Sequence, residues 1–266
     1  MMTPTPPKIR ILYVGDSWLN AGTLGAYSSL TYELRGVTVE NWAQKIIDTW
    51  RRNSNLEVDY LTGWDALARF PETPEAIGRY DMVFLSDLES DSIVLYPMER
   101  SMRSPMGPNR LKLIREYVRG GGALAMIGGY ASFTGRHNAG NYHGTAVEEV
   151  LPVNCLAIND DRAETPEGVT VSVTQPEHSI VRDIDWNTCP VFNGYNRVEV
   201  KPNAEVLARI RETGDPLIVV GTFEKGRSFA FTSDIAPHWG AGFQEWAYCE
   251  RFLEQVVMWL AGRAAR

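Results

Sequence analysis

Side chains that could carry out acid–base chemistry follow directly after several apolar, strand-like segments of the sequence. They are Asp16 and Ser17 after residues 9–14, Asp87 after residues 81–85, and Asp234 with His238 after residues 228–232. A carboxylate and an imidazole can act as general acid and base, and a serine beside such a base can act as a nucleophile. We therefore take Ser17, Asp234 and His238 as candidate catalytic residues, with Asp16 and Asp87 as candidate binding residues.

A second group of candidate binding residues surrounds a glycine-rich turn. It comprises Gly128, Gly129 and Tyr130 after residues 123–127, Arg136 and His143 in the loop that follows, and two tryptophans, Trp18 and Trp239. The glycines would either line a backbone site for an anion or substrate, or allow close packing. The loop is a substrate lid or a solvated connection. The tryptophans suit a ring-shaped ligand such as a sugar, or the core.

The same residues indicate no cofactor. Gly128-Gly129-Tyr130 matches neither the dinucleotide fingerprint nor a phosphate-binding loop. The four histidines lack the spacing of metal ligands on one helix, so we expect no metal. A site built from His143, His238, Asp16 or Asp234 would have to assemble from distant parts of the chain.

The elements that must position these residues form an alternating pattern in the first half of the chain. We expect strands at residues 9–14, 56–61, 81–85 and 123–127, and helices at residues 41–52, 74–79 and 108–119. This order predicts a parallel sheet with right-handed crossovers, whose strands end at the same edge. Side chains after those strands should therefore share one pocket, where crowding perturbs their pKa values.

The second half of the chain predicts an antiparallel extension of that sheet. We expect strands at 169–174 and 197–200, a hairpin from 217–223 and 228–232, and a final helix over 244–262. Residues 88–108 are expected to form a long loop, and residues 1–8 a flexible leader. The whole chain, 1–266, is predicted to be a single domain.

Composition excludes several classes of protein. Of the 266 residues, 44% are hydrophobic and 11% aromatic, which suffices for a full core, and the net charge of −7 does not suit a nucleic-acid-binding protein. The number of cysteines, three, is odd, which argues for a reducing compartment. No apolar run approaches the length of a membrane span. We therefore expect a cytoplasmic protein with a small-molecule ligand and without nucleic-acid or membrane partners, and a homo-oligomer remains open.

Three segments of the sequence together resemble a known family. They are GGGALAMIGGYASFTG, YHGTAVEEVLPV and DPLIVVGTFEKGRSFAFTSDIAPHWG. They resemble the glutamine amidotransferase-like family of bacterial cytoplasmic proteins, which is similar in fold to class I glutamine amidotransferases and to trehalose-utilisation proteins. The resemblance implies a flavodoxin-like, three-layer α/β sandwich with a partly antiparallel C-terminal extension of its sheet.

The resemblance also implies where a catalytic cysteine would stand. A class I amidotransferase carries its nucleophilic cysteine on a tight turn after the central strand, where this chain has Gly128 and Gly129. His238 is the nearest counterpart of the catalytic histidine, although the usual histidine-x-glutamate pair is absent. We therefore expect a protein that does not hydrolyse glutamine and that binds or processes a small polar metabolite at this glycine elbow.

Two alternatives come from other classes of protein. Gly15-Asp16-Ser17 is similar to the serine motif of GDS-type esterases, which implies a hydrolase using Ser17 and His238. In those esterases two residues normally separate the aspartate from the histidine, whereas three separate Asp234 from His238. The third interpretation is a non-catalytic assembly protein that uses the same fold.

Overall fold

The computed structural model describes the backbone of residues 7–28 and 31–263, and the side chains of those residues except in the segment 20–38. Most of the predicted leader, residues 1–6, lies outside the described residues. No helix within the described ranges is long and apolar enough to cross a membrane.

The strands and helices alternate through the first half of the chain, as the sequence predicts. The strands are β1 (Ile9–Gly15), β2 (Ser17–Ser28), β3 (Thr31–Asn41), β4 (Leu56–Leu61), β5 (Met82–Ser86), β6 (Ala123–Ile127), β7 (Val153–Cys155), β8 (Arg162–Val169), β9 (Val171–Val173), β10 (Phe192–Asn196), β11 (Val198–Val200), β12 (Glu205–Ile210), β13 (Pro216–Phe223) and β14 (Gly226–Phe231). The α-helices are α1 (Gln44–Arg52), α2 (Gly63–Arg69), α3 (Pro74–Ile77), α4 (Asp91–Val94), α5 (Met98–Ser101), α6 (Arg110–Arg119), α7 (Ala146–Val150), α8 (Pro237–Gly240) and α9 (Cys249–Leu260).

One eight-stranded sheet organises the molecule, in the order β4-β1-β5-β6-β14-β13-β12-β9. β4, β1, β5, β6 and β14 run parallel, whereas β13, β12 and β9 continue the sheet in antiparallel pairs. The expected hairpin of β13 and β14 is thus confirmed. Its second strand joins the parallel half of the sheet, so that four neighbouring parallel strands end at one edge.

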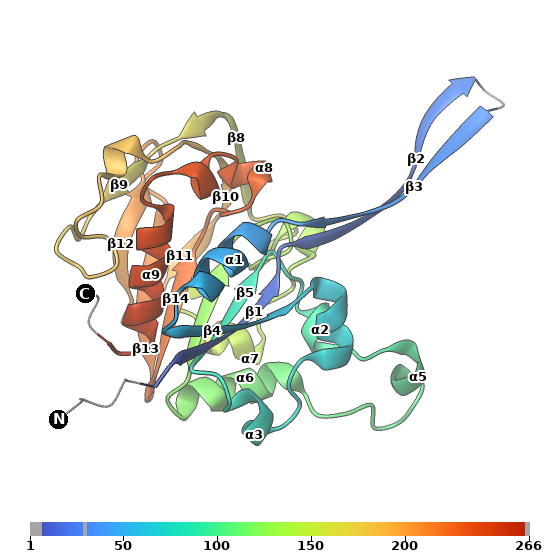
Figure 1. Ribbon diagram of the computed structural model, residues 1–266, viewed down its shortest axis with the longest axis horizontal. Helices are drawn as coiled ribbons and strands as arrows, with labels where there is room; N and C mark the ends of the chain where they lie inside the picture. Colours follow the sequence, from blue (N-terminus) through green and yellow to red (C-terminus); the bar gives the residue numbers. More distant parts are fainter. Residues whose placement is uncertain (1–6, 29–30, 264–266) are drawn as a thin grey trace.

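Helices cover both faces of the sheet and make it a three-layer structure (Figure 1). On one face α1 and α9 pack in the core that contains Tyr13 and Phe84. On the other face α2, α6 and α7 pack in the core that contains Val83 and Met126. Because successive residues of a strand point to opposite faces, β5 and β6 contribute to both cores, and every residue of β6 is buried. The prediction of a central β6 strand is confirmed.

Several boundaries differ from the sequence prediction. The helix predicted over residues 41–52 begins later, because Asn41 ends β3 and α1 begins after Ala43, which makes no side-chain cap. The predicted loop 88–108 contains the one-turn helices α4 and α5. The predicted final helix begins only at Cys249, because a 3₁₀ turn over Phe243–Glu245 precedes it. Short helices are set by tertiary packing, which local propensity does not record.

The largest difference is a two-stranded ribbon that replaces the expected loop after Gly15. β2 and β3 pair antiparallel, and among the described strands they pair with each other only. The ribbon extends away from the body of the molecule, beginning at the edge where β1 ends (Figure 1). Its base therefore belongs to the surroundings of Asp16.

Candidate functional site

The register of the sheet aligns the ends of four parallel strands. Gly15 of β1 pairs with Ser86 of β5, Ser86 pairs with Ile127 of β6, and Ile127 pairs with Phe231 of β14. The chain leaves each strand at the same edge, so the residues after these four lie in neighbouring positions. This is the edge at which open α/β sheets bind ligands.

Asp16 and Asp87 occupy matching positions, one residue beyond β1 and β5. Both have backbone φ angles in the left-handed region, 47° and 41°, which aspartate tolerates better than most residues. Both are buried, with 1% and 5% of their surface exposed. One carboxylate oxygen of each is fixed: Asp16 Oδ2 accepts a hydrogen bond from the Tyr13 hydroxyl, and Asp87 Oδ1 accepts one of 2.6 Å from the Ala131 N–H.

Asp234 and His238 approach the same edge from the segment after β14. Asp234 is fully buried, and its Oδ1 accepts a 2.6 Å hydrogen bond from the Ala236 N–H. Its Oδ2 lies 2.8 Å from His238 Nδ1. The two atoms lie at the distance of an ion pair, and neither has a hydrogen bond to a described residue. The short helix α8 places the imidazole one turn beyond the carboxylate.

Three carboxylates thus meet around one imidazole, and each has an oxygen without a partner. The unpartnered atoms are Asp16 Oδ1, Asp87 Oδ2 and Asp234 Oδ2, together with both ring nitrogens of His238. Burial and the charge of Asp234 raise the pKa of Asp16 to about 7. Burial and the same charge raise the pKa of Asp87 well above its usual range. These shifts follow from removing carboxylates from water and placing them close together.

His238 responds to its surroundings in the opposite sense. Burial lowers its pKa, but the contact with Asp234 and the charges of Asp87 and Asp16 outweigh burial and leave the pKa raised. The imidazole therefore favours its protonated form more than a free histidine does. We name Asp16, Asp87, Asp234 and His238 the acid–histidine cluster.

Aromatic rings surround the imidazole. The ring centroid of His238 lies 4.5 Å from that of Tyr130, 5.5 Å from that of Trp239 and 5.9 Å from that of Trp42. Trp42 in turn lies 6.1 Å from Trp18 at the base of the ribbon. These rings limit the access of water to the imidazole and define the directions from which a ligand can reach it.

Gly129 allows the Asp87 carboxylate to lie against the elbow. Its φ is +149°, and a Cβ at this position would stand 2.4 Å from Asp87 Cγ. A cysteine side chain would therefore occupy the space that Asp87 fills. The elbow residue of this chain is a glycine because a neighbouring carboxylate takes the place of a side chain.

Asn196 is a positioning residue that the sequence analysis missed. Its Oδ1 accepts a 2.9 Å hydrogen bond from the Gly129 N–H, and its Nδ2 donates to the Gly129 carbonyl at 3.1 Å. The Nδ2 also donates to Asp161, a buried carboxylate whose pKa burial raises to about 6. No motif marks these residues, because they become neighbours of the elbow only through folding.

The backbone of the elbow is consequently occupied by the chain itself. The Gly128 N–H donates to Phe231, the Gly129 N–H to Asn196 and the Ala131 N–H to Asp87. These amides hold the elbow together, and their contacts do not support the expected role of Gly128 and Gly129 as an anion-binding backbone.

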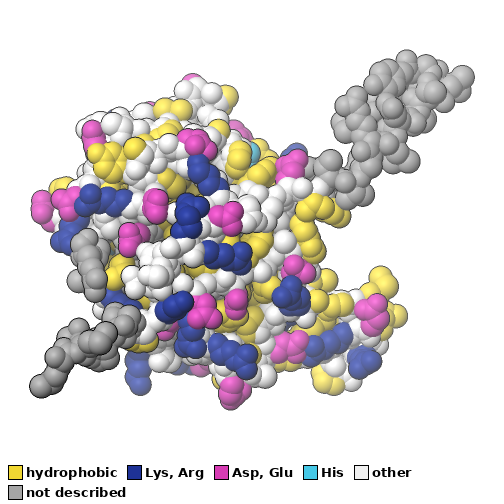
Figure 2. Space-filling model, viewed as in Figure 1, with side chains coloured by type: hydrophobic (Ala, Val, Ile, Leu, Met, Phe, Trp, Pro, Cys, Tyr) yellow, Lys and Arg dark blue, Asp and Glu magenta, His cyan; other side chains and the backbone are white. Residues whose placement is uncertain are grey.

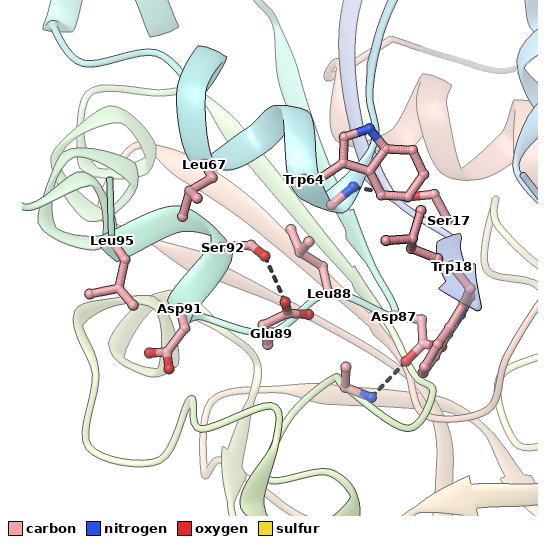
Figure 3. Close-up of a pocket in the computed structure, with 13 residues that line it drawn as sticks. Ser17, Trp18, Trp64, Leu67, Asp87, Leu88, Glu89, Asp91, Ser92 and Leu95 are labelled. Atoms are coloured by element: carbon pink, nitrogen blue, oxygen red, sulfur yellow. Dashed lines mark hydrogen bonds between the residues drawn. The ribbon is translucent and has the colours of Figure 1, made fainter. Parts of the chain in front are cut away.

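A cavity of about 450 Å³ lies beside the acid–histidine cluster. Asp87 belongs to both the cluster and the cavity wall (Figure 3). The rest of the wall is formed by aromatic, aliphatic and acidic residues, two serines and a glycine, and comprises Ser17, Trp18, Leu19, Gly63, Trp64, Leu67, Leu88, Glu89, Asp91, Ser92, Leu95 and Ala131. Asp16, Tyr130 and His238 are not among the residues that line this cavity, so this cavity does not meet the expectation that all candidates share one pocket.

Four other predicted residues lie elsewhere in the site or outside it. Ser17 Oγ lines the cavity and accepts a 2.8 Å hydrogen bond from the Gly63 N–H, and within the described residues it has no hydrogen bond to His238. Trp239, predicted as a ligand platform, is 1% exposed and packs on Gly194. Arg136 lies over the Tyr130 ring at 5.8 Å. His143 contacts Glu148 and the Cys155 carbonyl, and its hydrogen bonds to described residues include none to the cluster.

Comparison with known proteins adds a family and a fold. Residues 10–262 match the sequence profile of a family, GATase1_like, described as "putative glutamine amidotransferase". A cytoplasmic protein of Salmonella typhimurium, STM3548, has 32% identity and a TM-score of 0.85, with 94% of this chain and 98% of that chain covered. Another, STM1381 of strain LT2, has 37% identity and the same TM-score, with 95% and 99% covered.

More distant structures share the fold alone. A ThuA-like protein from Parabacteroides merdae has 11% identity and a TM-score of 0.56, covering 97% of this chain and 92% of that chain. Among curated proteins, none matches the sequence.

Proposed function

The chain belongs to the GATase1_like family of glutamine amidotransferase-like proteins, and from that premise we propose that it binds and processes a small, neutral, hydroxyl-rich metabolite. The acid–histidine cluster would supply general acid–base catalysis, in place of the nucleophilic thiol of class I amidotransferases. One observation carries the proposal: Asp87 is shared between the cluster and the adjacent cavity.

The chemistry of the cavity wall favours a neutral ligand over an anionic one. Asp87, Glu89 and Asp91 contribute carboxylates, and among the described residues that line the cavity there is no lysine, arginine or histidine. A phosphate or carboxylate ligand would face uncompensated repulsion at this wall. Hydroxyl groups, in contrast, can donate hydrogen bonds to carboxylates.

Two tryptophans make the wall suitable for a sugar-like ring. Trp18 and Trp64 line the cavity, and the indole N–H of Trp18 is buried without a hydrogen-bond partner (Figure 3). An aromatic face and a free donor next to carboxylate acceptors form an apolar wall with a few convergent polar groups, which is typical of small-molecule sites. The volume falls within the range of such sites, about 300–1,000 Å³.

The cluster is equipped for general acid–base catalysis. A protonated imidazole and a carboxylate whose pKa lies near neutrality can donate and accept protons at physiological pH. Asp16, with its pKa at about 7, and His238 have these properties. Asp87 connects them to a ligand in the cavity.

The two alternatives have less support. A serine hydrolase needs a nucleophile within reach of its base. Ser17 Oγ instead contacts the Gly63 N–H, and His238 Nδ1 faces Asp234. An assembly role is favoured by one observation, the projecting β2–β3 ribbon (Figure 1).

We include a cytoplasmic location in the proposal, because both Salmonella relatives are named cytoplasmic proteins.

The experiment is a saturation-transfer NMR screen of neutral monosaccharides, disaccharides and polyols against their phosphorylated or carboxylated counterparts. It is run once with EDTA and once with added Zn²⁺. We expect transfer to neutral members, at least tenfold weaker binding of the charged counterparts, and loss of binding in Trp18→Ala. The matched control is Val191→Ala, an exposed apolar residue outside the cavity wall. The proposal fails if no neutral member binds under either condition, or if Trp18→Ala binds as well as the control.

A further inference from the structure

We propose that Asp87, Asp234 and His238 form a binding site for one divalent transition-metal ion. One potential ligand atom of each residue lies within 4.8 Å of the other two. The three residues follow two different strands, β5 and β14, so that the fold itself brings them together. The site lies within the cluster on which the proposed function rests, but its test needs no substrate.

In Asp87 and Asp234, one carboxylate oxygen is held by the chain and the other is left for an external ligand. In Asp87 and Asp234 alike, one oxygen is held by a backbone N–H, at 2.6 Å in both cases. The other oxygen of each is buried and has no hydrogen-bond partner. A buried carboxylate oxygen without a partner is costly, and a metal ion is one of the few groups that satisfies it. The fixed oxygen keeps the free one in place before an ion arrives.

The contact between His238 and Asp234 has the spacing of two ligands on one ion. Nδ1 and Oδ2 lie 2.8 Å apart without forming a hydrogen bond. Two ligand atoms at about 2.1 Å from one ion would be about 3.0 Å apart at the right angle of octahedral coordination and about 3.4 Å apart at a tetrahedral angle. The observed separation is closer to the value for a right angle, and Asp87 Oδ2 would supply a third ligand from the end of β5, two strands away from β14.

The negative charge of the cluster also favours the binding of a cation. Asp16 adds a third carboxylate, whose charge acts on both Asp87 and His238. Within the described part of the chain, the ion pairs include none between a lysine or arginine and Asp16, Asp87 or Asp234. A histidine binds a metal ion as the neutral imidazole. A bound divalent ion would therefore take over from the imidazolium the compensation of the carboxylate charge.

The ligand types select the ion. Carboxylate oxygens alone suit Mg²⁺ and Ca²⁺, whereas an imidazole nitrogen favours Mn²⁺, Fe²⁺ or Zn²⁺. Three protein ligands leave a further coordination position for water or a ligand hydroxyl, as in catalytic metal sites. Because Asp87 also lines the cavity, that position would be accessible to a hydroxyl-rich ligand, and a bound ion would make such a hydroxyl easier to deprotonate.

The test is calorimetric titration of untagged, EDTA-treated protein with Zn²⁺ and with Mn²⁺ at neutral pH. We expect one ion per chain, and at least tenfold weaker binding in Asp87→Asn, Asp234→Asn and His238→Gln. The matched controls are Asp59→Asn, an exposed carboxylate, and His178→Gln, a histidine that packs near Trp259. Both controls should bind as the wild type does. The electron paramagnetic resonance spectrum of bound Mn²⁺ should change in the same three variants only.

Folding is checked independently. Each asparagine variant keeps an oxygen for its backbone N–H donor and removes a negative charge, so the metal-free variants should unfold at the wild-type temperature or above it. The proposal is overturned if neither ion binds at millimolar concentration, or if folded variants of the three ligands bind like the controls. Carbohydrate binding in EDTA without any metal binding would overturn this inference and leave the proposed function standing. Metal binding without any carbohydrate ligand would overturn the proposed function and leave this inference standing.

Discussion

Asp16 has a carboxylate that is almost fully removed from water and lies close to other charges. The groups that act on it are the hydroxyls of Tyr13 and Ser86 and the charges of Asp234 and His238. Burial has the largest effect and the charge of Asp234 the next, and together they raise the pKa to about 7. In the unfolded chain the pKa of an aspartate is about 3.9. Between these two values the folded protein holds a proton that the unfolded chain has released.

This difference predicts how Asp16→Asn changes the pH dependence of stability. Since the folded state binds more protons between about pH 4 and pH 7, the free energy of unfolding of the wild type falls as the pH rises through that window. Asparagine does not titrate, and its oxygen can still accept the Tyr13 hydrogen bond. The stability of Asp16→Asn relative to wild type should therefore rise with pH, by up to about 1.4 kcal/mol per unit.

Urea unfolding at pH 5 and at pH 7, with EDTA present, measures this effect. The control is Asp59→Asn, an exposed carboxylate. Equal differences between Asp16→Asn and wild type at the two pH values would show that Asp16 is ionised throughout and would contradict the prediction.

Because its three thiols are buried or partly buried, we expect that the protein does not release ammonia from glutamine. Cys155 and Cys249 are buried and Cys189 is partly buried. Burial raises the pKa of Cys189 and of Cys249 to about 12, and that of Cys155 well above its usual range. The reactive thiolate is therefore scarce near neutral pH. Ellman's reagent should label the native protein more than about tenfold more slowly than the protein in urea.

Ammonia release is measured for the wild type and for a variant with all three cysteines replaced by serine. Both should equal the rate without protein. Activity that is present in the wild type and lost in the variant would contradict the prediction and would identify one of the thiols as a nucleophile.

At the scale of elements, the elbow after β6 depends on the contact between Gly129 and Asp87. Gly129→Ala would place a Cβ 2.4 Å from Asp87 Cγ on a backbone with φ of +149°. We expect a loss of stability on the order of 1–3 kcal/mol from the strained backbone, and a displaced Asp87 in addition. The control is Gly214→Ala, with φ of +79° and nothing within 4 Å of the new Cβ.

Two measurements separate the collision from the strained backbone. Urea unfolding should show a larger loss for Gly129→Ala than for Gly214→Ala, and Zn²⁺ affinity should fall for Gly129→Ala only. If the two variants behaved alike in both measurements, the contact with Asp87 would not constrain the elbow.

Elements with a strong local pattern could be predicted from the sequence, and others could not. The apolar run at β6 and the hairpin of β13 and β14 are confirmed, because burial on both faces and a tight turn leave direct marks in the sequence. The β2–β3 ribbon was missed. Gly15-Asp16-Ser17 has the composition of a loop, and the left-handed turn at Asp16 does lie there, but the chain resumes a strand at Ser17.

The residues of the candidate site also differ in whether the sequence could predict them. Asp16, Asp87, Asp234 and His238 were found because each follows a predicted strand, and topology then requires their convergence. Asn196 and its partner Asp161 were missed because their role depends on tertiary contacts with the elbow. For Trp239 the sequence left a ligand platform and the core both open, and the absence of a side chain at Gly194 gives the indole a buried position.

For the molecule as a whole, the visible surface carries charges of both signs without a large basic region (Figure 2). This agrees with a net charge of −7 and offers no electrostatic reason for nucleic-acid binding.

The β2–β3 ribbon is the feature that projects from the body of the molecule. Two exposed apolar residues at its base, Leu19 and Val39, have 58% and 60% of their surface accessible.

The ribbon predicts that two copies of the chain associate. A two-stranded ribbon is marginally stable in water by itself, and the described strands offer β2 and β3 no partner but each other. A second copy of the chain would cover the apolar base and extend the pairing. Light scattering coupled to size-exclusion chromatography should therefore give a dimer or larger assembly.

Because Leu19 pairs with Val39, replacing residues 20–38 by an Asn-Gly turn should close the hairpin in register. That variant should be monomeric and keep the Zn²⁺ affinity of the acid–histidine cluster, whose residues lie outside the ribbon. A wild type that is monomeric at every concentration, or a shortened variant that still associates, would rule out the ribbon as the contact between copies.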